Sequence, residues 1–353
     1  MIISRTPFRV SFFGGGTDYP AWYRRHGGAV LAAAIDKYCY LTCRYLPPFF
    51  DHRYRCVYSK IESVQNIEDI EHPAIRAVLG YLGIDQGLEI HHDGDLPARS
   101  GMGSSSAFTV GLLHALHALR GEMLSSHQLA LEAIHVEQEV IRETVGSQDQ
   151  ITAAYGGFNH IIFRENGDFE VHPVTISAER MRELNAHLLL LYTGIKRTAS
   201  DIASSFVTRI DERRRQLRIM ADLVREALTV LTGSGGLEAF GELLHEAWLV
   251  KRSLSNAVSN ERVDSLYERA RRAGAIGGKL TGAGGGGFLV LFAPPERHER
   301  IRAELANLIH VPFSFDRSGS QIIFFDHERD YSEQSRIRAQ QKIDAFRELT
   351  PCP

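Results

Sequence analysis

The sequence predicts an α+β protein in two halves, and three observations lead to that prediction. Strand and helix patterns are mixed along the 353 residues without a strict β–α–β alternation, which disfavours a doubly wound sheet. Long helical patterns are concentrated in the second half of the chain. Polar residues and Pro173 interrupt the pattern between residues 165 and 185. We therefore expect a first domain at residues 1–170 and a second at residues 171–353.

The first half is rich in strand patterns. A loosely alternating apolar segment ends at the triple glycine Gly14–Gly16, as in a strand followed by a tight loop. Other short segments rich in small apolar, Tyr, Thr or Cys residues favour strands, and apolar residues at helical spacing favour helices. We expect strands at 1–13, 29–35, 37–45, 53–58, 88–92 and 158–163, and helices at 72–82, 104–119, 126–144 and 148–155.

The second half combines short strands with long helices. Gly274–Phe292 has the pattern of two strands joined by a glycine-rich loop, and the last polar segment has amphipathic helical spacing. No internal repeat is visible. We expect strands at 187–192, 311–315 and 320–325, and helices at 198–232, 236–256, 261–273, 296–308 and 332–349.

Composition and charge exclude several classes of protein. The chain is 44% hydrophobic and 24% charged, with a net charge of −3, which disfavours a nucleic-acid-binding surface. No stretch of about 18 apolar residues predicts a membrane span, and the first residues carry no signal-peptide pattern. The four cysteines lack a CxxC spacing and fit a reducing compartment. We therefore expect a cytoplasmic protein that binds small molecules and neither nucleic acid nor a membrane.

A loop of small residues at Pro97–Ala107 is the strongest functional signal. It runs directly into the apolar helical pattern of residues 108–119. Glycines let successive backbone N–H groups point inward, and a helix N-terminus adds its positive dipole end, so this arrangement favours phosphate binding. The serine hydroxyls could ligate a magnesium ion beside the phosphates. The alternative is a flexible turn in which a serine caps the helix.

Two common nucleotide-binding motifs are excluded. Walker A requires Gly-Lys-Ser/Thr, whereas Leu280 follows Gly278-Lys279. The run Gly282–Gly287 satisfies GxGxxG as a string, but the strand pattern of residues 288–292 follows it where a dinucleotide-binding fold requires a helix. This glycine run therefore favours a loop of close approach shaped for a ligand, with a wide hairpin as the alternative.

Three carboxylates and one arginine are candidates for chemistry. Asp149, amid small and amide residues, is either a helix cap or a base that deprotonates a hydroxyl for attack on phosphorus. Glu137 would ordinarily be a solvated helix residue. Asp18 follows the triple glycine, where it could form an Asx turn or hold two sugar hydroxyls. Arg9, flanked by apolar residues, faces solvent or serves as a buried counter-charge that favours an ionised base.

The segments Pro7–Tyr19, Pro97–Ala107 and Lys279–Phe288, in this order, resemble the three motifs of the GHMP kinases, which include galactokinase, homoserine kinase, mevalonate kinase and phosphomevalonate kinase. The resemblance spans most of the chain. It implies an N-terminal domain like ribosomal protein S5 domain 2 and a ferredoxin-like C-terminal domain. It also implies that ATP and substrate lie in the cleft between the two domains.

The resemblance implies a role for each candidate residue. Asp149 matches the catalytic aspartate, and Arg9 matches the arginine beside it. Asp18 matches a sugar-binding aspartate, while Ser105 and Glu137 match the ligands of Mg²⁺. The second motif carries the phosphate loop, which implies ATP contacts at Gly101, Met102, Gly103, Ser104, Ser105 and Ser106.

The first motif departs from the galactokinases, which have Glu-His where this chain has Gly15-Gly16. Loss of both side chains opens space, so galactose is disfavoured and a bulkier sugar is favoured. Residues 5–19 and 145–150 resemble the branch that acts on heptose 7-phosphates, which implies MgATP-dependent phosphorylation of an anomeric hydroxyl. Alternatives are a fucose- or galactose-type sugar kinase and a nucleotide-binding regulator without turnover.

Substrate contacts are expected from the glycine loops and from a basic pair that could hold a sugar phosphate by charge-assisted contacts. The adenine base is expected near residues 58–64 by analogy of fold. The last polar helix is a candidate for self-association as a homodimer. The expected substrate contacts are Gly14, Gly15, Gly16, Asp18, Lys196, Arg197, Gly284 and Gly285.

Overall fold

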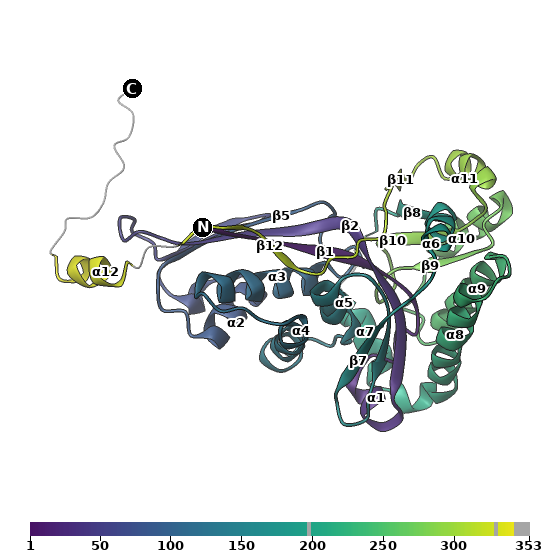
Figure 1. Ribbon diagram of the computed structural model, residues 1–353, viewed down its shortest axis with the longest axis horizontal. Helices are drawn as coiled ribbons and strands as arrows, with labels where there is room; N and C mark the ends of the chain where they lie inside the picture. The colour runs from purple at the N-terminus through teal and green to yellow at the C-terminus, as the bar shows by residue number, and fades with distance from the viewer. Residues whose placement is uncertain (196–198, 328–330, 342–353) are drawn as a thin grey trace.

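The computed structural model describes residues 1–195, 199–327 and 331–341 and arranges them around two β-sheets (Figure 1). The larger sheet belongs mainly to the first half of the chain. Its strands are β1 (Ile2–Phe13), β2 (Gly28–Tyr45), β3 (Tyr54–Val57), β4 (Ile61–Val64), β5 (Leu88–Gly94), β6 (Phe158–Phe163), β7 (Phe169–Pro173) and β12 (Gln321–Phe325). They follow the order β12-β1-β2-β5-β3-β4, and β6 and β7 extend the sheet from the first residues of β2.

Helices of the first half cover one face of this sheet, below it in Figure 1. They are α1 (Pro20–His26), α2 (Pro73–Leu82), α3 (Ser104–Leu119), α4 (Ser126–His135) and α5 (Gln148–Tyr155), with a 3₁₀ turn η1 (Ile67–Asp69) and a π-helical turn η2 (Val136–Val140). Residues 2–5 of β1 alternate between buried and half-buried, whereas residues 6–13 are all buried. The second pattern arises because the second half of the chain covers the other face of β1 there.

The second sheet contains β8 (Leu188–Tyr192), β9 (Gly277–Leu280), β10 (Phe288–Phe292) and β11 (Ile309–His310), in the antiparallel order β11-β8-β10-β9. Within the described residues, no helix is both long and apolar enough to span a membrane. The helices of this half are α6 (Ala178–Ala186), α7 (Ala199–Val207), α8 (Arg214–Thr232), α9 (Glu238–Arg252), α10 (Glu261–Ala273), α11 (His298–Glu304) and α12 (Ser332–Ala339), with 3₁₀ turns η3 (Ile210–Arg213) and η4 (Pro295–Arg297).

The two strands expected at 29–35 and 37–45 form one long strand, β2. Its first residues pair with β6 and its last residues pair with β5, so β2 serves two parts of the sheet. The register between β1 and β2 shifts between Pro7 and Arg9. A bulge redirects the side chains that follow it. The shift therefore sets the direction of the Arg9 side chain, whose contacts are described below.

Other differences from the expected elements follow from local structure. The helix expected at 126–144 ends as a regular α-helix at His135 and continues as the π-helical turn η2. The helix expected at 198–232 is divided into α7, η3 and α8. The strand expected at 311–315 is absent from the described residues there, where Phe315 forms only an isolated bridge with Ile35. The short elements β4, β7 and α6 were not expected from the sequence.

A shared hydrophobic core joins the two halves. Phe12 and Phe13 of β1 make edge-to-face contacts with Phe240 of α9, with ring centroids 5.7 and 5.2 Å apart. This packing fixes α9 against the sheet that carries the first glycine motif. Strand β12 returns from the second half and pairs antiparallel with β1 (Figure 1). The last part of the chain therefore completes the first sheet, across the division expected at residues 170 and 171.

Candidate active site

A cavity of about 230 Å³ lies where the two halves meet, and we call it the cleft cavity. It gathers residues from all three glycine-containing motifs, although these are far apart in the sequence. Eleven of the expected site residues line it: Arg9, Gly15, Gly16, Asp18, Gly101, Gly103, Ser104, Ser105, Ser106, Asp149 and Gly284.

Arg9 and Asp149 form a two-pronged ion pair in this cavity. Nε and Nη2 of Arg9 donate to Oδ1 and Oδ2 of Asp149, both at 2.6 Å, while Nη1 donates to the carbonyl of Gly101 at 2.7 Å. The Arg9 side chain is 4% exposed, and that of Asp149 is 24% exposed. The guanidinium thus fixes a partly open carboxylate against the loop that enters α3, as bidentate geometry allows.

Asp18 lies beside this pair as a second, fully buried carboxylate. Its Oδ1 accepts from the Gly16 amide at 2.8 Å, and its Oδ2 accepts from Nε2 of Gln148 at 2.9 Å. Burial raises the pKa of Asp18, while these hydrogen bonds oppose that shift. The first glycine motif and the start of α5 therefore both hold the Asp18 carboxylate in place. Its partner on α5, Gln148, directly precedes Asp149 in the sequence.

The loop at residues 99–103 and the first turn of α3 have the geometry of an anion site. Gly101 and Gly103 have φ angles of +79° and +73°, which favour glycine. Helix α3 begins at Ser104, so its free N–H groups face the loop. Asp149 Oδ2 and the Arg9 side chain lie within 3.6 Å of where a Cβ atom of Gly103 would be. The carboxylate is therefore directly beside the loop.

The third glycine run packs against this same loop. A Cβ atom on Gly287 would lie 2.1 Å from the carbonyl oxygen of Ser100, and one on Gly282 would lie 2.6 Å from the Cα of Gly101. The Phe288 amide also donates to the Ser100 carbonyl at 3.2 Å. Close backbone approach therefore explains these glycines, as expected for a loop between β9 and β10 rather than a dinucleotide-binding turn.

Glu137 lies on the π-helical turn η2 and is 1% exposed. Its Oε2 accepts from the Ser106 hydroxyl at 2.9 Å and from Nε2 of Gln150 at 2.5 Å. Its Oε1 has no hydrogen-bond partner among the described residues. Burial raises the pKa of Glu137 to about 7. The alternative of a solvated helix residue is therefore wrong, and the Glu137 carboxylate keeps one buried oxygen without a hydrogen-bond partner among the described residues.

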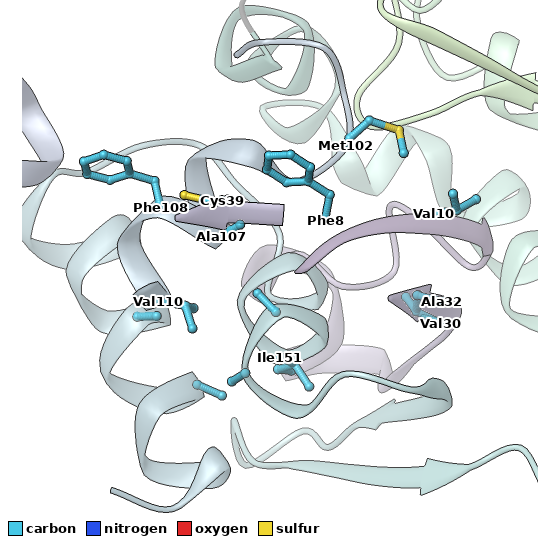
Figure 2. Packing of buried hydrophobic residues seen from close by; sticks show 14 of the residues in the cluster. Phe8, Val10, Val30, Ala32, Cys39, Met102, Ala107, Phe108, Val110 and Ile151 are labelled. Carbon is cyan, nitrogen blue, oxygen red and sulfur yellow. The ribbon is translucent and has the colours of Figure 1, made fainter. Parts of the chain in front are cut away.

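Some expected site residues lie elsewhere. Gly14 serves packing, because a Cβ atom there would lie 1.9 Å from the Ala29 carbonyl oxygen. Met102 is fully buried, and Figure 2 shows it in the hydrophobic core near Phe8. Gly285 is bonded to Val258, whose carbonyl accepts from its amide at 2.8 Å. None of the three lines the cleft cavity within the described part of the chain.

Two further expectations concern the outer parts of the site. Lys196 and Arg197 lie outside the described residues. The segment 58–64, where the adenine base was expected, does not line the cleft cavity. There the Tyr58 hydroxyl donates a hydrogen bond to Glu62 at 2.6 Å.

The expected serine ligand Ser105 is exposed in the cavity, while the hydroxyl that contacts Glu137 belongs to Ser106.

The sequence reasoning missed Gln148 and Lys251, which both line the cavity. Gln148 directly precedes Asp149 and holds Asp18. Lys251 continues the buried face of α9, which includes Phe240, Leu244 and Trp248 at helical spacing. A lysine in the register of a core stripe was the available signal, because a buried ammonium requires a specific partner.

Comparisons with known proteins find two family models and several relatives that match this chain. Residues 69–157 match the family model of the GHMP kinases N terminal domain, and residues 220–310 match that of the GHMP kinases C terminal domain. The chain is 28% identical to D-glycero-alpha-D-manno-heptose 7-phosphate kinase of Campylobacter jejuni over 90% of this chain and 97% of that protein. It is 29% identical to a galactokinase of Thermococcus kodakarensis over 86% of this chain and 92% of that protein.

Solved structures show the same fold. A D-glycero-D-manno-heptose 1-phosphate kinase from Bacteroides thetaiotaomicron superposes with a TM-score of 0.73 at 23% identity, covering 91% of this chain and 98% of that chain. Galactokinase of Lactococcus lactis, complexed with galactose, gives a TM-score of 0.70 at 18% identity, covering 91% and 95%. The α+β prediction and the expected two-part fold are confirmed by these likenesses.

Proposed function

Because the chain belongs to the GHMP kinases and is a sugar kinase, we propose that it phosphorylates the anomeric hydroxyl of D-glycero-D-manno-heptose 7-phosphate, using ATP and yielding the 1,7-bisphosphate. The observation that supports this most is the Arg9–Asp149 pair, which lies against the phosphate-type loop of α3 in one cavity. A base beside an anion site is what transfer of a phosphoryl group to an alcohol requires, and binding alone does not.

In this proposal, the loop amides and the N-terminus of α3 hold the phosphates of ATP and spread the charge that develops on the transferred group. Asp149 orients the sugar hydroxyl and accepts its proton as the oxygen attacks phosphorus. Arg9 fixes the carboxylate through two hydrogen bonds and ties it to the Gly101 carbonyl, so base and loop keep one geometry. Positioning of this kind supplies most of the catalysis in phosphoryl transfer.

The residues around Glu137 fit a magnesium ion. Mg²⁺ is usually held by one or two carboxylates, water and substrate phosphates, so a large cluster of protein ligands is not required. Glu137 offers a buried oxygen without a partner, and the hydroxyls of Ser105 and Ser106 adjoin the loop. When bound, Mg²⁺ would neutralise charge on the phosphate oxygens. Glu137 and Ser105 remain the proposed ligands, with Ser106 as the residue that orients Glu137.

The sugar side of the cavity supports a substrate larger than galactose. Gly15 and Gly16 line the cavity without side chains, and Asp18 presents a fixed carboxylate next to them. Lys196 and Arg197 remain candidates for the 7-phosphate. The relative in Campylobacter jejuni, named as a heptose 7-phosphate kinase, supports this substrate, while the galactokinase relative supports a simple sugar as the alternative.

A sugar panel tests the proposed function. The protein is incubated with MgATP and heptose 7-phosphate, heptose, mannose, fucose or galactose, with ADP release as readout and NMR to locate the new phosphate. We expect the highest kcat/KM for the heptose 7-phosphate, with phosphate on C1. A preference for fucose or galactose would establish the alternative substrate class. Absence of sugar-dependent ADP release would identify a regulator that binds nucleotide without turnover.

Substitution of Gly146 tests the sugar-binding role of Asp18. A Cβ atom on Gly146 would lie 2.0 Å from Oδ2 of Asp18, so Gly146→Ala displaces that carboxylate. Loss of a hydrogen bond to a charged group should raise KM for the sugar by roughly 10- to 100-fold, with ATP affinity retained. The control is Gly80→Ala, since nothing lies within 4 Å of its Cβ position. An unchanged KM for the sugar in Gly146→Ala would contradict the role of Asp18.

The biological setting is part of the proposal. Cys39, Cys43 and Cys56 are buried and free, which fits a reducing compartment such as the cytoplasm, where ATP is available. The 1,7-bisphosphate would serve as a precursor for bacterial surface polysaccharide. Self-association through α12, whose residues contribute nothing to the described core, remains a prediction that sedimentation analysis can check.

A further inference from the structure

Lys251 is an unassigned cation in the wall of the cleft cavity. It lies in the last turn of α9 and is 6% exposed, yet it lines the cavity together with Arg9, Asp18 and Asp149. It comes from the second half of the chain, whereas the other three come from the first half. The packing of Phe240 on β1 fixes the position of α9, so Lys251 is held by the core and not by a surface loop.

The contacts of Lys251 leave its ammonium only partly satisfied. Nζ donates to the carbonyl of Gly282 in the third glycine run, and this is its only hydrogen bond within the described chain. An ammonium has three donors. Burial and the charge of Arg9 lower its pKa to about 8, while the carboxylates of Asp18 and Asp149 raise it. The Lys251 ammonium therefore interacts with both carboxylates of the site by long-range electrostatics, without a hydrogen bond to either.

The Lys251 ammonium has no carboxylate within hydrogen-bond distance in the described chain, although cations and carboxylates are equally numerous in the lining of the cleft cavity. Arg9, Arg99 and Lys251 line it together with Asp18, Glu143 and Asp149, and Arg9 is already paired with Asp149. Lys279 is a further buried ammonium, whose pKa is lowered by burial and by the charge of Lys251. Lys279 donates to the Phe12 carbonyl at 2.9 Å and does not line the cavity. Of the two buried ammonium groups, Lys251 and Lys279, Lys251 is therefore the one that can contact a ligand in the cavity. A buried cation beside an open cavity favours an anion there, because an isolated buried charge is costly.

We propose that Lys251 is a further catalytic residue, whose ammonium binds the non-bridging oxygens of the phosphoryl group during its transfer. The inference rests on the proposed sugar kinase activity. The anomeric oxygen forms the new bond to the γ-phosphorus, the bond from that phosphorus to the β–γ bridging oxygen breaks, and the sugar hydroxyl proton passes to Asp149. ADP leaves with the electron pair of the broken bond. Lys251 keeps its proton throughout and donates hydrogen bonds.

The position of Lys251 favours the reacting phosphoryl group over a distant phosphate of the sugar. Its hydrogen-bond partner, the carbonyl of Gly282, belongs to a residue that packs closely on Gly101 of the phosphate loop. A Cβ atom added to Gly282 would lie 2.6 Å from the Gly101 Cα. The two carboxylates that act on Nζ are the proposed base and the proposed sugar ligand. Lys251 therefore lines the same cavity as the loop and the proposed base, where an ammonium could offset the charge that develops in the transition state.

Three variants test this inference with the full-length protein: Lys251→Met, Lys251→Arg and the control Arg252→Met. Arg252 is the next residue of α9, but its guanidinium pairs with Asp264 at 2.7 Å. The acceptor is the best sugar of the panel above. We measure kcat, the affinity for MgADP, and the affinity for MgADP with aluminium fluoride and sugar, which mimics the transition state.

We expect Lys251→Met to lower kcat by about 10²- to 10³-fold and to weaken the transition-state mimic by a similar factor, while MgADP binds within about threefold of wild type. Lys251→Arg should recover part of the loss, and Arg252→Met should match wild type. A kcat of Lys251→Met within about fivefold of wild type would overturn the inference. Equal losses for MgADP and for the mimic would also overturn it, since they indicate a structural role.

The pH dependence of the wild type provides a test that does not require Lys251→Met to fold. Arg9, Asp18 and Asp149 are the charged groups that shift the pKa of Lys251, and the buried Lys279 is a further ammonium whose own pKa is lowered by burial and by the charge of Lys251. We expect kcat/KM to fall above about pH 8 as the ammonium loses its proton, and this fall to be absent in Lys251→Arg. An alkaline fall that is identical in both proteins would overturn the inference. Failure of the wild type to phosphorylate any sugar would instead reject the proposed function.

Discussion

Replacement of Asp149 by asparagine is expected to lower kcat by roughly 10²- to 10⁴-fold, with ATP affinity nearly unchanged. Asparagine has a similar shape but cannot accept the hydroxyl proton. The Arg9 side chain keeps its hydrogen bond to the Gly101 carbonyl at 2.7 Å, so the phosphate loop retains that support. The loss should therefore appear in the chemical step. Steady-state kinetics together with calorimetric titration of a non-hydrolysable ATP analogue measure the two effects separately.

The matched control for this variant is Asp93→Asn, because Asp93 is an aspartate of β5 outside the cavity lining. It should leave kcat and nucleotide affinity unchanged. Turnover of Asp149→Asn comparable to that of wild type would reject Asp149 as the base. A change confined to KM would reject it as well, because the loss of a proton acceptor affects the transition state more than the bound substrate.

We expect Glu137→Gln to raise the free energy of unfolding of the metal-free protein relative to wild type. This gain should be larger at pH 8 than at pH 4 by about 3 kcal/mol. Burial raises the pKa of Glu137 to about 7 in the folded protein, from the ordinary glutamate value of 4.5 that applies to the unfolded chain. The folded state therefore binds this proton more tightly than the unfolded state does. Its contribution to the free energy of unfolding is complete below pH 4.5 and is lost as the pH rises through 7, when the buried carboxylate becomes charged.

Urea unfolding of wild type and Glu137→Gln between pH 4 and 8, in the presence of a chelator, measures this difference. The control is Glu139→Gln, since Glu139 lies on the same π-helical turn but is exposed. A stability difference that does not grow with pH would contradict the buried environment of Glu137. Addition of MgADP at pH 8 provides a second readout, because only an ionised Glu137 can hold Mg²⁺. We expect MgADP to raise Tm more for wild type than for Glu137→Gln.

Local patterns were sufficient to predict the phosphate-type loop and its helix. Small residues followed by an apolar helical pattern predicted a helix at 104–119, and α3 occupies these residues. The positions of Gly101 and Gly103 at positive φ follow from the same local chemistry. Asp18, Asp149 and Arg9 were identified as candidates, but only the resemblance to GHMP kinases connected them. Nothing in the spacing of residues 9, 18 and 149 indicates that they meet.

Residues whose role depends on long-range packing were beyond the reach of local patterns. Glu137 lies in a helical segment that shows no sign of its burial, and its environment arises where η2 packs behind Ser106. Met102 and Gly14 look like loop residues of a binding site, but the core and the Ala29 backbone occupy their surroundings. Lys251 differs, because its place in the apolar register of α9 is visible in the sequence.

The sequence alone determined the class of fold, the loop that can hold phosphate and the types of side chain available for transfer, because these depend on neighbouring residues and on helical or strand periodicity. The tertiary structure decided which of these side chains share one cavity, and it added Lys251 and Gln148 to them. It also raises the pKa of Glu137, because it buries that side chain. Distances and burial arise from contacts between segments more than a hundred residues apart, such as Arg9 with Asp149, and no local pattern encodes them.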